Sequence, residues 1–91
     1  MKVIWSRTAE HDRSQIIKHI GQEDVLAAVR MDALFAKAAL RLASHPHLGK
    51  PGAVSGTFEL IVHKSYRLVY EIHNSEISIL TLMHTARLWP R

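Results

Sequence analysis

Apolar and polar residues alternate with a period of two between positions 56 and 72, which predicts two antiparallel strands joined by a tight connection at 63–65. One face of this hairpin would carry Phe58, Leu60, Val62, Tyr66, Leu68, Tyr70 and Ile72. The other face would carry Glu59, His63, Arg67 and Glu71, mixed with Ile61 and Val69. The first face is large enough to seat a helix, and the second is the candidate working surface of the sheet.

Two helical patterns precede this hairpin. Apolar residues spaced by about 3.6 positions predict helices over 9–20 and 23–43. We expect Ser6 or Thr8 to cap the first helix and Gly21 to end it in the left-handed conformation. Alanines in the second helix favour helix formation and allow a partner helix to approach closely. The two helices are therefore expected to form a hairpin on the apolar sheet face.

Two further strands complete the predicted sheet. One is a short strand at 2–6, and the other, at 76–84, is apolar on both faces and is expected to be central. In the second, Ile77, Ile79, Thr81 and Met83 would share one side, and Ser78, Leu80, Leu82 and His84 the other. The segment 44–52 contains prolines and glycines without an apolar period and is expected to be a loop. This order predicts an α+β fold, with an N-terminal strand and a helical hairpin packed on one face of a small, twisted, mostly antiparallel sheet.

Composition narrows the class of protein. A chain of 91 residues is expected to form one domain, residues 1–91. The absence of cysteine excludes disulfides and thiolate metal sites and favours the cytoplasm. We find neither a signal-like leader nor an apolar run near the roughly 20 residues that a membrane helix needs, so no membrane partner is expected. The formal net charge of +4 favours an anionic partner, either nucleic acid or an acidic protein segment.

Metal and cofactor sites have little support in the sequence. His45 and His47 could form half of a metal site, but two histidines cannot fill a tetrahedral zinc shell and no acidic or cysteine partner is near. The chain also lacks a Gly-rich phosphate loop. We therefore expect no metal and no cofactor.

Basic and titratable residues gather where the predicted strands end: His63, Lys64, Arg67, His84 and Arg87. Arginine can hold a phosphate through two donors, and histidine can transfer a proton near neutral pH. A metal-free ribonuclease needs a base, an acid and cations for the phosphate, which these residues would supply. Alternatively, Arg67 pairs with Glu59 or Glu71 across the sheet and His84 only caps a strand. Trp89 would either stack on a base or a protein, or close one end of the core.

Several segments resemble the RelE/ParE superfamily, the toxins of bacterial type II toxin–antitoxin modules. The resemblance is strongest in the sequence YRLVY at 66–70, followed by HTARLWP at 84–90, and it covers nearly the whole chain. It implies a helical hairpin against a twisted antiparallel sheet. It also implies a cognate antitoxin whose binding segment is disordered alone and often acidic, which a basic toxin would suit.

Two activities divide this superfamily. ParE-like members poison DNA gyrase, whereas RelE-like members enter the ribosomal A site and cut mRNA. The long alanine-rich hairpin and the HTARLWP ending look more like ParE. In addition, Glu59 and Ile61 stand where RelE has lysines, and a carboxylate there would neutralise Arg67. We therefore predict a gyrase poison in which no residue is catalytic and Arg67, Arg87 and Trp89 are structural or contact residues.

Two alternatives from other functional classes remain. The first is a RelE-like, metal-independent mRNA endonuclease, and only this alternative would make the protein an enzyme. Its catalytic residues would be Arg67, His84, His63 and Arg87, with Lys64, Tyr66 and Trp89 in binding. The second is an inactive module that only binds antitoxin.

Overall fold

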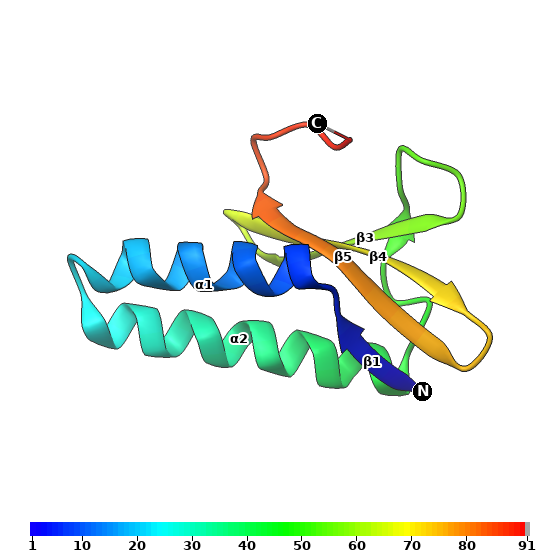
Figure 1. Cartoon of the computed structure of the whole chain (residues 1–91), viewed down its shortest axis with the longest axis horizontal. Helices are drawn as coiled ribbons and strands as arrows, with labels where there is room; N and C mark the ends of the chain where they lie inside the picture. Colours follow the sequence, from blue (N-terminus) through cyan, green and yellow to red (C-terminus); the bar gives the residue numbers. More distant parts are fainter. Residues whose placement is uncertain (91) are drawn as a thin grey trace.

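The computed structural model describes residues 1–90. Its elements are, in order, β1 (Lys2–Trp5), α1 (Arg7–Gly21), α2 (Val25–Ser44), β2 (Lys50–Pro51), β3 (Thr57–His63), β4 (Tyr66–His73) and β5 (Glu76–His84). The two helices lie side by side against one face of a five-stranded sheet (Figure 1). This arrangement confirms the predicted α+β fold. Within these residues, neither helix combines the length and the apolar character that crossing a membrane requires.

The strand order is β1-β5-β4-β3-β2, with β1 parallel to β5 and every other pair antiparallel. The short strand β2 lies within the segment predicted to be all loop, and that prediction is wrong there. Two residues are too few to show an alternating pattern, and β2 forms because Lys50 and Pro51 pair with Glu59 and Phe58 of β3. Proline is tolerated at this position because β2 is an edge strand.

The strand β5 is central only over its first half, because β1 pairs with it no further than Ile79. Beyond that point, Asp12 of α1 takes the place of a neighbouring strand. Its carboxylate accepts the hydroxyl proton of Thr81 at 2.6 Å and the backbone N–H of Leu82 at 3.3 Å. This contact satisfies a backbone donor at the open edge and joins the first helix to the last strand.

A bulge at Leu80 changes which side chains of β5 are buried. Ile79 and Thr81 pair with consecutive residues of β4, so Leu80 is the extra residue. The two rows of side chains exchange faces beyond the bulge, and Leu82 joins Ile77 in the core. The prediction that residues 77, 79, 81 and 83 share one face is therefore wrong after Ile79.

The start of α1 follows the predicted capping chemistry, but the end of α1 does not, and α2 has a cap that was not predicted. Ser6 caps α1 and Asp24 caps α2, and each side chain accepts a backbone N–H three residues later at 3.0 Å. Gly21 lies inside the last turn of α1, and its φ is not positive. The chain turns because the Ile20 carbonyl accepts the N–H groups of two residues in the connection, so no left-handed glycine is needed.

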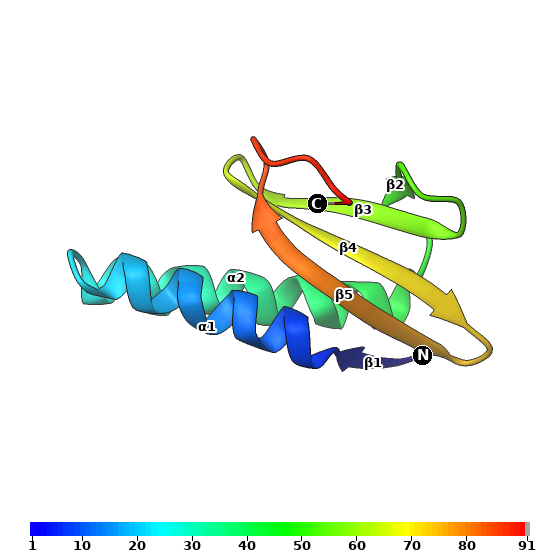
Figure 2. The same ribbon diagram turned by 45° about the horizontal axis from the view of Figure 1, so that its top comes forward.

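The main core lies between the helical hairpin and the sheet. Its buried members are Ala9, Phe35, Ala38, Leu42, Leu60, Leu68, Tyr70, Ile77, Ile79 and Leu82. The other side of the sheet, here called the outer sheet face, has no helix on it. Figure 2 shows the C-terminal tail, residues 85–90, running back over this side instead. Val69 points to the outer sheet face by strand alternation and is nevertheless fully buried.

Tyr70 connects the loop after α2 to the sheet. Its hydroxyl donates to the carbonyl oxygen of Pro46 at 2.8 Å and accepts the backbone N–H of Gly49 at 2.9 Å. A Cβ on Gly49 would lie only 2.7 Å from the carbonyl oxygen of Glu59, so glycine is required for this close approach. Burial raises the pKa of Tyr70 above 10.0, while the hydrogen bond from Gly49 opposes this rise.

Replacing Tyr70 by phenylalanine is expected to lower the free energy of unfolding by about 1–3 kcal/mol, because it leaves the Pro46 carbonyl and the Gly49 N–H unpaired. The difference in free energy of unfolding between the wild type and Tyr70→Phe should also depend on pH. Because the pKa of Tyr70 is raised in the folded protein, the unfolded chain loses this proton first, so the stabilisation is complete below about pH 10 and decreases above it. Urea unfolding of both proteins at about pH 8 and pH 10.5 measures this change. An identical difference at the two pH values would contradict the raised pKa.

Candidate functional site

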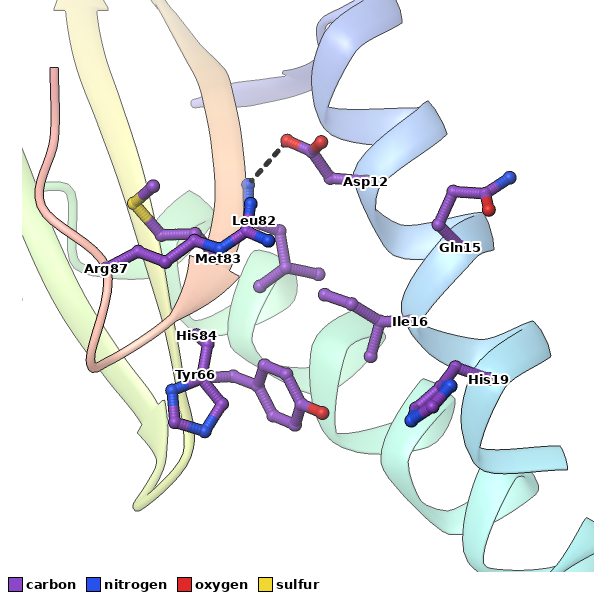
Figure 3. Close-up of a pocket in the computed structure, with 9 residues that line it drawn as sticks. All are labelled: Asp12, Gln15, Ile16, His19, Tyr66, Leu82, Met83, His84 and Arg87. Atoms are coloured by element: carbon purple, nitrogen blue, oxygen red, sulfur yellow. Dashed lines mark hydrogen bonds between the residues drawn. The ribbon is translucent and has the colours of Figure 1, made fainter. Parts of the chain in front are cut away.

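A pocket of about 270 Å³ lies where the start of β4 and the end of β5 meet α1 (Figure 3). We call it the hairpin-end pocket. Its lining residues are Asp12, Gln15, Ile16 and His19 from α1, Tyr66, Leu82, Met83 and His84 from the sheet, and Arg87 from the tail. Several of the site residues predicted from the sequence therefore meet here.

Tyr66 is the centre of an aromatic cluster at this pocket. Its ring lies edge-on to His84, with centroids 5.8 Å apart, and edge-on to Phe35 of α2 at 5.7 Å. The His63 ring is 6.2 Å away on the neighbouring strand. Figure 3 shows the Tyr66 hydroxyl pointing toward α1, and no residue between 1 and 90 hydrogen-bonds it. This hydroxyl is therefore available to a ligand.

Both histidines of the cluster have one nitrogen engaged by the backbone. Nδ1 of His84 accepts the N–H of Ala86 at 3.0 Å, and Nδ1 of His63 accepts the N–H of Ser65 at 3.1 Å. A nitrogen that accepts carries no proton, so each neutral ring has its proton on Nε2. In this arrangement, His84 and His63 present a hydrogen-bond donor outward, whereas the lone pair that a general base needs is already used.

Arg67 lies on the outer sheet face and is not among the residues that line the hairpin-end pocket. Its Nη1 donates to Glu59 Oε1 at 3.1 Å, and its Nη2 donates to the backbone carbonyl of Arg87 in the tail. The two charged side chains are only 16% and 10% exposed. Arg67 Nε is buried without a hydrogen-bond partner within the described residues. The guanidinium thus connects β3, β4 and the tail.

The structure divides the predicted site into two groups. Tyr66, His84 and Arg87 meet at the hairpin-end pocket, but Arg67 lies on the other side of the sheet from Tyr66 and His84 and reaches Arg87 only at its backbone carbonyl. His63 was expected beside Arg67 on the outer sheet face, and that placement is wrong. A register shift in β3 between Ile61 and His63 turns His63 toward Tyr66.

The remaining predicted contact residues lie in the turn and the tail. Lys64 is exposed in the β3–β4 turn, and its backbone carbonyl accepts the hydroxyl of Thr85 at 3.0 Å. Trp89 is half-buried in the tail and does not belong to the core between helices and sheet. The interpretation that Trp89 closes one end of that core is therefore wrong.

Sequence reasoning missed the contribution of α1 to the pocket. Asp12, Gln15, Ile16 and His19 are spaced by three or four residues, so one face of the helix carries all of them. That spacing was visible in the sequence, but it also fits an ordinary wet helix face. Only the packing of α1 on the end of β5 shows that this face borders a cavity.

Residues 3–89 match the profile of a family described as the ParE toxin of the type II toxin–antitoxin system parDE. The chain belongs to this ParE toxin family. It is 32% identical over 91 residues to the toxin homologue Y4kP of Sinorhizobium fredii, covering 99% of this chain and 94% of that protein. It is 34% identical over 87 residues to Toxin RelE2 of Caulobacter vibrioides, covering 96% and 98%. The protein is thus a type II toxin of the RelE/ParE superfamily.

Solved structures confirm the ParE-family fold. The chromosomal ParDE toxin–antitoxin system of P. aeruginosa gives a TM-score of 0.81 at 20% identity, covering 92% of this chain and 95% of that one. The YoeB/ParE toxin of Agrobacterium tumefaciens gives 0.66 at 16% identity, covering 92% and 98%. At these identities the likeness concerns the fold alone. The names of the relatives include both ParE and RelE, so family membership does not select the cellular target.

Proposed function

We propose that this ParE-family toxin inhibits growth by poisoning DNA gyrase, and that a cognate antitoxin neutralises it. The observation that carries the proposal is the shielded Arg67–Glu59 ion pair. In the RelE-like reading, Arg67 stabilises the phosphate of the cleaved RNA, which requires a positive charge that is not already balanced. Here Glu59 balances that charge at 3.1 Å, and the tail occupies a further donor. A poison that acts by binding needs no such free cation.

The same proposal covers partner and location. A P. aeruginosa structure with this fold is a ParDE toxin–antitoxin system, and the formal net charge of +4 suits an acidic antitoxin segment here. We place the protein in the cytoplasm and treat residues 1–91 as one domain.

A ribosome-dependent mRNA endonuclease is the second candidate, and the hairpin-end pocket is the observation that favours it. The pocket combines the free Tyr66 hydroxyl, the outward Nε2–H of His84 and the exposed Arg87. These groups would donate to a phosphate or protonate a leaving oxygen. In this candidate Arg67 supports the tail and does not contact phosphate.

The direct experiment incubates purified, antitoxin-free protein with DNA gyrase, ATP and supercoiled plasmid. We expect protein-linked double-strand breaks that increase with toxin concentration. Absence of breaks with protein that is folded and toxic in cells would reject the gyrase proposal and favour mRNA cleavage. Absence of toxicity on induction would instead indicate an inactive antitoxin-binding module.

Replacing His84 by alanine is expected to leave toxicity essentially unchanged, because a gyrase poison uses no proton-transferring side chain. His73→Ala is the matched control, since His73 is an exposed histidine at the opposite end of β4. Growth inhibition and ribosome-dependent mRNA cleavage are measured for both variants at equal amounts of folded protein. A nuclease using His84 would lose activity by about 100-fold or more while His73→Ala kept it, and that pattern would contradict the gyrase proposal.

A further inference from the structure

One flank of α2 carries a row of cations. Residues of a helix are rotated by roughly 100° per position, so Arg30, Lys37 and Arg41 lie within about 40° of one another around the helix axis. All three are exposed, and within residues 1–90 none of them forms a salt bridge. The acidic residue of α2, Asp32, points to the opposite side of the helix, where it is paired with α1. We call Arg30, Lys37 and Arg41 the α2 basic row.

The α2 basic row borders a groove between α2 and the sheet. The groove has a volume of about 340 Å³ and is lined by Leu34, Lys37, Ala38, Arg41 and Val62. Since Val62 belongs to β3, the groove brings two of the three cations beside that strand. Its apolar surface is small, because Leu34 is 40% exposed and Val62 is half-buried.

The edge of β3 at this groove is open. β2 pairs with β3 only at Phe58 and Glu59, and no other strand of residues 1–90 lies on that side. The backbone groups of such an edge are available to another molecule. However, the register shift between Ile61 and His63 distorts the edge, and both bulges and charged side chains disfavour the addition of a further strand. This edge therefore suits a partner that accepts separate hydrogen bonds.

The protein does not neutralise the cations at this groove. The segments that form its walls, 30–45 and 60–64, contain one acidic residue, Asp32, which is already paired on the other side of α2. Glu59, the acidic residue next along β3, is paired with Arg67 on the outer sheet face. The groove is thus a positively charged surface that an anionic partner would neutralise.

The small apolar area distinguishes between two kinds of anionic partner. A protein interface has an apolar core surrounded by a polar rim, and Leu34 and Val62 alone supply too little surface for such a core. Binding to a nucleic acid backbone depends instead on lysine and arginine side chains, assisted by backbone N–H groups. These are the groups that the α2 basic row and the open edge of β3 provide.

We propose that the α2 basic row and the adjoining edge of β3 bind the sugar–phosphate backbone of duplex DNA. The inference rests on the proposed gyrase function, which brings the toxin to DNA, and adds which side of the toxin faces that DNA. At a rise of 1.5 Å per residue, the row extends over about 16 Å along the helix axis. Phosphates of one strand follow one another at about 3.4 Å along the duplex axis, so the row contacts several of them at once.

Fluorescence anisotropy with the full, antitoxin-free chain and a short labelled duplex DNA tests the surface without gyrase. Three cations on phosphates should give a slope of log Kd against log salt of about 3, so the Kd should rise about 40-fold between about 50 and 200 mM salt. A labelled, glutamate-rich helical peptide and a labelled single-stranded RNA are the comparison probes. We expect both to bind more weakly than the duplex at each salt concentration.

Single substitutions locate the contact. Arg30→Gln, Lys37→Gln and Arg41→Gln should each lower the slope by about 1, so the Kd of each variant should rise only about tenfold over the same salt range. Lys18→Gln is the matched control, because it removes the same charge from an exposed lysine of α1. It should keep the slope of the wild type. Circular dichroism confirms that the variants are folded.

The gyrase cleavage assay connects the surface to the proposed function. Lys37→Gln combined with Arg41→Gln should need about tenfold more toxin than the wild type for equal protein-linked breaks, whereas Lys18→Gln should need the same amount. If the wild type bound duplex DNA through the α2 basic row but produced no breaks, the gyrase proposal would fail and the DNA-binding surface would stand. Failure of the surface is therefore a different result from failure of the proposed function.

Three results would overturn the proposed surface. The first is binding of duplex DNA that is absent or independent of salt. The second is an equal salt slope for the wild type, Lys37→Gln and Arg41→Gln. The third is tighter binding of the glutamate-rich peptide or of the single-stranded RNA than of the duplex, which would assign the α2 basic row to another class of partner.

Discussion

Phe35→Ala is expected to lower the free energy of unfolding by about 3–5 kcal/mol, because it removes a fully buried ring from the centre of the core. Small domains have total stabilities of about 5–15 kcal/mol, so this loss would leave much of the protein unfolded near its growth temperature. The substitution would also remove the edge-on contact between the Phe35 and Tyr66 rings, whose centroids are 5.7 Å apart. Urea unfolding followed by circular dichroism measures the change.

Leu40→Ala is the matched control for this experiment. It truncates a large side chain on the same helix, but Leu40 is exposed, so the expected change is within about 0.5 kcal/mol. Similar losses for Phe35→Ala and Leu40→Ala would mean that α2 does not face the sheet as described.

Arg67→Ala is expected to cost about 2–4 kcal/mol, because it leaves the Glu59 carboxylate shielded from water without its cation. The truncation also removes the donor that holds the Arg87 carbonyl, so the tail should become accessible to proteases. Arg30→Ala, which removes an exposed arginine, should change the free energy of unfolding by no more than about 0.5 kcal/mol.

A double variant separates the burial of charge from the loss of packing. Arg67→Met combined with Glu59→Gln keeps side chains of similar length without a charge, so it should recover most of the stability that Arg67→Met alone loses. If the double variant instead lost as much stability as the two single variants together, the ion pair would not be coupled. A stable, folded Arg67→Ala protein without toxicity would show that this arginine acts on a target.

Local patterns in the sequence predicted most of the fold. Both strands of the central hairpin, both helices and the cap at Ser6 depend on residues close together in the chain. Errors occurred where one inserted residue changes the geometry. The bulge at Leu80 and the shift before His63 each exchange the faces of a strand, because side chains alternate with a period of two.

The candidate site was less predictable, because its contacts join distant parts of the chain. The sequence placed Glu59 within reach of Arg67 as one of two possible partners, and the structure selects it. Nothing in the local pattern indicated that the Arg67 guanidinium also holds the tail at Arg87, or that α1 borders the pocket of His84.

The sequence by itself determined both helices and the four longer strands, the α+β class, the basic charge and the resemblance to a toxin family, since these depend on composition, period and short motifs. The tertiary structure decided which polar groups meet. It placed Asp12 against Leu82, 70 positions apart, and put Arg67 and His84 on opposite sides of the sheet. The physical reason is that side-chain contacts depend on strand register and helix packing, and a shift of one residue in either brings a different set of side chains together.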